Sequence, residues 1–163
     1  MATLVELRNA GSLVDIDPLE SHELPWRTLY ATPDFINWLD VTLPLLPHKP
    51  EYSAMTPQEQ VFASFADFAS GAAFSDDRRF KKLSASPDNF VWEIKSEEVR
   101  VFGWVPEKNV FVCCFGDSKD NIVVNNSYGL HIARTVFMRT NLDLNEPKYV
   151  ESKEYRDVLS NKT

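Results

Sequence analysis

Three short runs of strand-forming residues, separated by polar breaks, constrain the fold of this 163-residue chain more than any other feature. The runs are Phe90–Lys95, Val99–Trp104 and Asn109–Phe115, and all three are rich in aromatic and β-branched residues. The breaks between them, Ser96–Glu98 and Pro106–Lys108, have the length of hairpin loops. The pattern therefore predicts three consecutive antiparallel strands.

Two helices are predicted ahead of these strands. The first begins at Thr32-Pro33-Asp34, after a short strand at Trp26–Tyr30, and prolines at 44 and 47 end it. The second begins at Thr56-Pro57-Gln58-Glu59, which offers an N-cap, a proline at the first helical position and a glutamate three residues after the cap. The apolar residues of the two helices recur at helical spacing: Phe35, Ile36, Leu39 and Leu43 in the first, and Val61, Phe65, Phe68 and Ala72 in the second.

A last helix is predicted over Leu130–Met138, where apolar residues again recur at helical spacing. The elements together predict an α+β fold, in which a small antiparallel sheet packs against two N-terminal helices and is followed by a C-terminal helix. We divide the chain into an acidic arm (residues 1–25), one α+β domain (26–140) and a polar tail (141–163) that is expected to fray.

Charge is unevenly distributed along the chain. Residues 1–77 carry a net charge of −9 and residues 78–163 a net charge of +2, which gives the whole chain −7. The overall field does not attract nucleic acid, so RNA binding requires a local basic face on the second half. The acidic arm is a hypothetical built-in antagonist that folds over such a face.

Several functional classes are disfavoured by what the sequence lacks. No apolar run reaches the ~18–20 residues that span a bilayer, and the first residues do not follow the plan of a signal peptide. Cys113 and Cys114 are adjacent, and His22, His48 and His131 lie far apart, so neither residue type has metal-ligand spacing. We expect a cytoplasmic protein without a membrane segment, metal or small-molecule cofactor.

Basic residues on or beside the strands are the candidates for chemistry. Strand alternation places Lys95 on the face opposite Trp92, and places Arg100 on one face with Phe102 and Trp104. A cation beside aromatic rings can hold a phosphate while a base stacks. The alternative is that Arg100 pairs with a glutamate on a neighbouring strand, which is a salt bridge of little consequence.

The same residues resemble a known family. The run Val91-Trp92-Glu93-Ile94-Lys95, then Arg100-Val101-Phe102, then Val110–Phe115 closed by Gly116-Asp117-Ser118-Lys119, is similar to the core of phage-derived HigB toxins of the RelE/ParE superfamily. The resemblance spans roughly Trp26 to Met138. It implies a RelE-like fold and the toxin of a toxin–antitoxin system, which cuts messenger RNA on the ribosome without a metal ion and is neutralised by an antitoxin protein.

The resemblance also implies roles for individual residues. Arg100 takes the position of the phosphate-stabilising arginine, and Lys119 that of the basic residue after the third strand. Tyr128 and His131 are candidates for the acid and base by their chemistry alone. The residues expected to bind RNA are Arg78, Arg79, Lys81, Lys82 and Lys95.

Two departures from the family pattern weaken this assignment and leave an alternative open. Asp117 and Asp120 replace a phenylalanine and a lysine of the pattern, and carboxylates beside the site weaken RNA binding. The alternative is a non-catalytic interaction or regulatory protein, encoded by a phage or prophage, that binds a protein partner.

Overall fold

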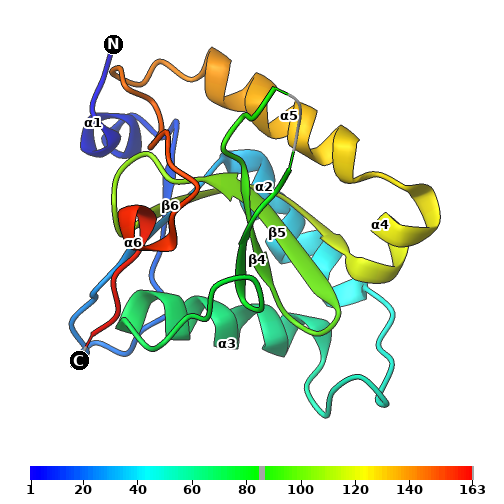
Figure 1. The fold of residues 1–163 in the computed structure, drawn as a ribbon. Coiled ribbons are helices and arrows are strands. Elements are labelled where there is room, and N and C mark those ends of the chain that lie inside the picture. The colour runs from blue at the N-terminus through cyan, green and yellow to red at the C-terminus, as the bar shows by residue number, and fades with distance from the viewer. Residues whose placement is uncertain (85–86, 163) are drawn as a thin grey trace.

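In the computed structural model, which describes residues 1–84 and 87–162, a six-stranded mixed sheet forms the centre of the fold (Figure 1). The strands follow the spatial order β1-β2-β6-β5-β4-β3. Their bounds are β1 Val14–Ile16, β2 Thr28–Ala31, β3 Phe80–Lys82, β4 Trp92–Lys95, β5 Val99–Trp104 and β6 Val110–Ser118. The three predicted antiparallel strands are confirmed as β4, β5 and β6.

The predicted fold, a small antiparallel RelE-like sheet against two N-terminal helices, is wrong. The sheet is mixed because β2 runs parallel to β6, and β1 and β3 add an edge strand on each side. Six α-helices lie in the described parts of the chain, not three. The physical reason is that Leu29, Tyr30 and Ala31 of β2 are all buried, so β2 needs a neighbouring strand on both sides and a covering layer on both faces.

One face of the sheet is covered by the two predicted helices. Helix α2 (Pro33–Asn37) continues through a π turn, η1 (Trp38–Thr42), into a 3-10 turn, η2 (Leu43–Leu45), and α3 spans Pro57–Ser70. Both predicted starts are confirmed, since Thr32 and Thr56 cap these helices and Thr56 forms a capping box with Glu59. Their apolar stripes enter an aromatic core around the stacked rings of Phe80 and Trp92, whose centroids are 4.7 Å apart.

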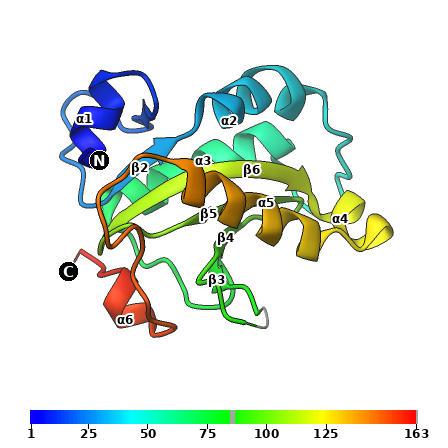
Figure 2. The ribbon, with the colours of Figure 1, turned by 90° about the horizontal axis from the view of Figure 1, so that it is seen from above.

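The other face is covered by helices from both ends of the chain (Figures 1 and 2). Helix α4 (Lys119–Asn125) follows β6 directly and leads into α5 (Tyr128–Asn141), which is longer than the predicted last helix. Helix α1 (Leu4–Asn9) packs beside them through Leu7, which joins Trp104 of β5 in a second apolar cluster. Both faces of the central strands are therefore buried.

Neither end of the chain behaves as a loose extension. Within residues 1–25, α1 and β1 are part of the fold, and Leu13 is 1% exposed. Because β1 pairs with β2 at the sheet edge opposite β3, this segment does not cover the basic strands, which removes the basis of the antagonist hypothesis. The tail was expected to fray, but it forms α6 (Tyr155–Val158) and buries Val158 and Leu159 against the aromatic core.

A buried cation joins β2, α3 and the tail. Arg27 is 1% exposed, and its guanidinium donates hydrogen bonds to the carbonyl oxygens of Phe68 (2.9 Å), Ala72 (3.1 Å) and Ser160 (3.0 Å). The guanidinium carbon also lies 5.3 Å from the centroid of the Phe68 ring. These carbonyls belong to the C-terminal end of α3 and to the tail, where a positive charge is favourable.

Replacement of Arg27 by alanine is expected to lower the free energy of unfolding by about 3 kcal/mol or more, because buried carbonyls lose their donors. Urea denaturation measures this change. Arg8→Ala is the matched control, since Arg8 makes only exposed contacts, an ion pair with Asp15 and a hydrogen bond to the Asn9 side chain, and it should cost less than about 0.5 kcal/mol. Equal effects of the two variants would contradict the assigned role of Arg27.

Candidate nucleic-acid-binding groove

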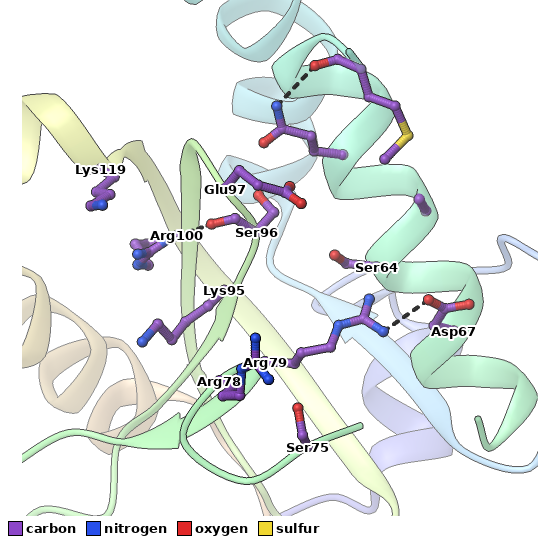
Figure 3. Close-up of a pocket in the computed structure, with 13 residues that line it drawn as sticks. Ser64, Asp67, Ser75, Arg78, Arg79, Lys95, Ser96, Glu97, Arg100 and Lys119 are labelled. Carbon is purple, nitrogen blue, oxygen red and sulfur yellow. Dashed lines mark hydrogen bonds and ion pairs between the residues drawn. The ribbon is translucent and has the colours of Figure 1, made fainter. Parts of the chain in front are cut away.

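A groove of about 620 Å³ extends around the hairpin that joins β4 to β5, with α3 on one side of the hairpin and Lys95, Arg100 and Lys119 on the other (Figure 3). Its cationic side chains come from the segment before β3, from β4, from β5 and from the start of α4. They are Arg78, Arg79, Lys95, Arg100 and Lys119, against two carboxylates, Asp67 and Glu97. All five cations are candidates that the sequence predicted, and we call this site the basic groove.

The floor of the basic groove contains a cross-strand pair of cations. Lys95 of β4 lies directly opposite Arg100 of β5, so the two side chains leave the same face of the sheet. Lys95 donates a hydrogen bond to the carbonyl oxygen of Asp77 at 3.1 Å. Burial, together with the positive charge of Arg100, lowers the pKa of Lys95.

Arg100 is held in place by the backbone of its own hairpin. Its side chain is largely buried, and Nη1 donates to the carbonyl oxygens of Ser96 at 2.5 Å and Val99 at 3.1 Å. Its Nε atom is buried and has no hydrogen-bond partner within the described structure. Part of this guanidinium is thus satisfied by the protein, and part has no protein acceptor.

The remaining cations form the rim of the basic groove. Arg79 is tied to Asp67 by an ion pair of 2.9 Å, whereas Arg78 and Lys119 are exposed. Across residues 1–84 and 87–162, no carboxylate lies within 4.0 Å of Arg78, Lys95, Arg100 or Lys119. Four cations that converge without a carboxylate partner make a site for an anion.

The acidic departures from the family pattern lie outside the basic groove. Asp120 forms an ion pair with Lys49 at 2.7 Å. Asp117 accepts a hydrogen bond from the Nε2 atom of His131 at 3.1 Å. Burial raises the pKa of Asp117, but hydrogen bonds from His131, Asn121 and the Ser118 backbone outweigh it, and the net pKa is lowered. Neither carboxylate lines the groove.

Two predicted site residues and two predicted RNA contacts also lie elsewhere. His131 is buried and stacks on Phe102 with ring centroids 4.7 Å apart, so it does not reach the basic groove. Tyr128 and Lys81 line a neighbouring hollow that shares only Lys95 with the groove. Lys82 pairs with Asp88 at 2.5 Å. The register of β4 and β5 brings Lys95 and Arg100 together, whereas α5 carries Tyr128 and His131 to another part of the same face.

A buried carboxylate that sequence reasoning missed fixes the wall of the groove. Glu98, 6% exposed, accepts hydrogen bonds from His48 Nδ1 (2.7 Å), the Lys49 backbone N–H (2.9 Å) and Gln60 Nε2 (2.8 Å). The Glu98 backbone N–H in turn donates to Gln60 Oε1 at 2.9 Å. The hairpin is thereby bound to α3 and to the loop before it. Nothing in the spacing of these residues signals their contact.

No model of a known protein family, no curated protein and no solved structure matches the chain. Among the described helices, none has the length and apolar content needed to cross a membrane. In the same parts of the chain, no three His, Cys, Asp or Glu side chains are grouped so that they could hold a metal ion.

Glu98 makes the stability of the groove depend on pH. Burial raises the pKa of Glu98, but hydrogen bonds from Lys49, His48 and Gln60 outweigh it, and the net pKa is lowered. A carboxyl with a lowered pKa in the folded state contributes stability above its unfolded pKa of about 4.3, and this contribution is lost as the pH falls through the folded pKa. The difference in unfolding free energy between wild type and Glu98→Gln is therefore expected to shrink below about pH 4.

Urea denaturation from pH 7 to pH 3 measures this difference. Glu97→Gln serves as the control because Glu97 is the exposed neighbour on the same hairpin, and its difference from wild type should stay small at every pH. A constant difference for Glu98→Gln over the whole range would contradict the proposed hydrogen-bonded carboxylate.

Proposed function

We propose that the basic groove binds the sugar–phosphate backbone of RNA and that the protein is a metal-independent endoribonuclease. The observation that carries this proposal is the convergence of Arg78, Lys95, Arg100 and Lys119, without carboxylate partners, in one groove. Cations of this kind neutralise the phosphate and stabilise the extra negative charge of a pentacoordinate phosphorane, a task that a metal ion performs in other nucleases.

The proposed cleavage uses the ribose 2′-hydroxyl as the nucleophile. Lys95, opposite Arg100 in the register of β4 and β5, accepts the 2′-hydroxyl proton in its neutral amine form as general base, and burial and the Arg100 charge, which lower its pKa, favour that form. The 2′ oxygen bonds to phosphorus, the bond from phosphorus to the 5′ oxygen breaks, and the Lys119 ammonium returns a proton to the 5′ oxygen. The products are a 2′,3′-cyclic phosphate and a free 5′-hydroxyl. Arg100 binds the phosphoryl oxygens that gain charge.

The biological setting that we propose rests on the sequence resemblance to phage-derived HigB toxins. In this setting the protein acts in the cytoplasm on messenger RNA bound to the ribosome, and an antitoxin protein neutralises it. Exposed apolar side chains on α4 and α5 offer such a protein partner a surface: Val123 (65% exposed), Val124 (82%), Leu130 (57%) and Phe137 (71%).

A second candidate function is a non-catalytic interaction protein. The observation that favours it is the position of His131, which is buried, paired with Asp117 and unable to serve as an acid or base in the groove. The same exposed apolar surface on α4 and α5 would then be the functional site. Catalysis separates the two candidates, because only the first requires RNA cleavage.

Binding of single-stranded RNA is expected to weaken as salt rises, because bound phosphates release counterions. Contacts from three to four cations predict a slope of log affinity against log salt of about −2 to −3. Lys119→Gln should reduce the magnitude of this slope by about 0.7. Fluorescence anisotropy of a labelled oligonucleotide measures it. Lys108→Gln, an exposed change in the β5–β6 hairpin, is the control and should leave the slope unchanged.

Induced expression in bacteria tests the toxin proposal directly. Wild type should arrest growth and produce cleaved messenger RNA with cyclic-phosphate ends, and an Arg78→Ala, Lys119→Ala double variant should relieve the arrest. Both residues are exposed, so the double variant should remain folded. Unimpaired growth with abundant folded wild-type protein would favour the interaction protein.

A further inference from the structure

A second hollow of about 270 Å³ adjoins the basic groove. Its lining includes Lys81 from β3, Glu93 and Lys95 from β4, and Tyr128 and Ile132 from α5. Lys95 lines both the hollow and the groove, so the two meet at this side chain. We call the hollow the side pocket.

Glu93 is an unusual residue for the wall of such a pocket. Its side chain is 2% exposed, and its Oε2 atom has no hydrogen-bond partner in the described structure. No cation of the described residues lies within 4.0 Å of the carboxylate. Burial raises the pKa of Glu93, while the charges of Arg100, Lys95 and Lys81 and a hydrogen bond from the Tyr128 hydroxyl oppose the rise. A buried carboxylate oxygen without a donor is costly, and a ligand that brings donors would offset this cost.

Lys81 is the neighbouring donor on the same face. It lies opposite Glu93 in the register of β3 and β4, and Lys95 lies two residues along β4 on that face. The side pocket thus places the Lys81 ammonium and the Lys95 amine beside a carboxylate, with Tyr128 and Ile132 on the helix side. Such a pocket fits a planar ligand that carries adjacent N–H donors next to an acceptor.

We propose that the side pocket binds a guanine base of the RNA and that Glu93 determines the specificity for guanine. This inference rests on the proposed function of the basic groove. The Watson–Crick edge of guanine carries two neighbouring donors, N1–H and the N2 amino group, which match the two oxygens of a carboxylate. The adjacent O6 atom accepts from the Lys81 ammonium, as it does from lysine in other guanine contacts.

The other bases fit this arrangement less well. Adenine and cytosine each present one amino group beside a ring-nitrogen acceptor, and that acceptor would face the second carboxylate oxygen. Uracil has one N–H between two carbonyl oxygens, which a carboxylate repels. Because Lys95 separates the side pocket from the basic groove, a bound guanine would place a neighbouring phosphate against Arg100 and Lys119.

The test measures binding of short oligoribonucleotides that differ only in one central base. Uridine-rich 10-mers carry a single G, A, C or U, with a 2′-O-methyl group at that position to prevent cleavage there. Fluorescence anisotropy is expected to give about ten-fold tighter binding for G, the discrimination of one bidentate base contact. Glu93→Gln should reduce the preference to about two-fold or less and leave the affinity for the other three nearly unchanged.

Glu97→Gln is the matched control, because Glu97 is an exposed glutamate that lines the basic groove and not the side pocket. It should bind all four oligonucleotides slightly more tightly and keep the preference for guanine. Wild type should also lose affinity when inosine, which lacks the N2 amino group, or 1-methylguanosine replaces guanosine. These two base analogues test the inference even where Glu93→Gln is poorly folded.

The outcomes distinguish this inference from the proposed function. Equal affinity of wild type for all four bases would overturn guanine recognition and leave RNA binding intact. Failure to bind any oligonucleotide would overturn the proposed function and this inference with it. A third outcome would also overturn the inference: Glu93→Gln slows the cleavage of RNA without the 2′-O-methyl group equally at every base and keeps the binding preference for guanine. The role of Glu93 would then lie in the reaction and not in base recognition.

Discussion

Burial of β5 on both faces is the constraint on which the rest of the structure depends. All six residues of β5 are buried, with Val99 and Val101 in the aromatic core and Phe102 and Trp104 against the helices of the other face. Arg100 is the one charged residue of this strand. Because it lies next to the β4–β5 hairpin, carbonyl oxygens of the hairpin can satisfy part of its guanidinium while the rest lines the basic groove. The same layers that bury β5 therefore place a cation where the strand leaves the core.

The distribution of ion pairs explains how a chain of net charge −7 forms a cationic groove. Two carboxylates near the groove are engaged by other partners, Asp120 by Lys49 and Asp117 by His131. Of the five cations that line the groove, only Arg79 has such a partner within the described residues. Charges in a concave site are screened less than charges on an open surface. The net charge of the chain therefore determines whether a distant polyanion is attracted or repelled, whereas the local ion pairing of the side chains determines whether the groove can bind an anion.

The sequence predicted the parts of the fold that depend on local chemistry. The capped helix starts at Thr32 and Thr56 and the meander of β4, β5 and β6 were all readable, because capping and alternation act between near neighbours. The parallel pairing of β2 with β6 joins residues about eighty positions apart, and no local pattern reports it. Val158 and Leu159 are two apolar residues in a polar tail, so their burial against the core was equally hidden.

The contacts of the site likewise include some that local sequence patterns predict and others that depend on the tertiary fold, and this difference affects the chemistry of the site. Alternation predicted which residues share a face with Lys95 and which with Arg100 within each strand, and the strand register, known only from the structure, places the two cations on one face. The contact of Glu98 with Gln60 depends on the path of the chain between α3 and β5. With His131 paired to Asp117, the basic groove contains no imidazole, and acid–base chemistry there falls to amines. Lys95 is the amine that also borders the side pocket. Under the proposed function, the base that occupies this pocket sets the distance between its neighbouring phosphate and Lys95, so base recognition and the rate of cleavage depend on the same side chain.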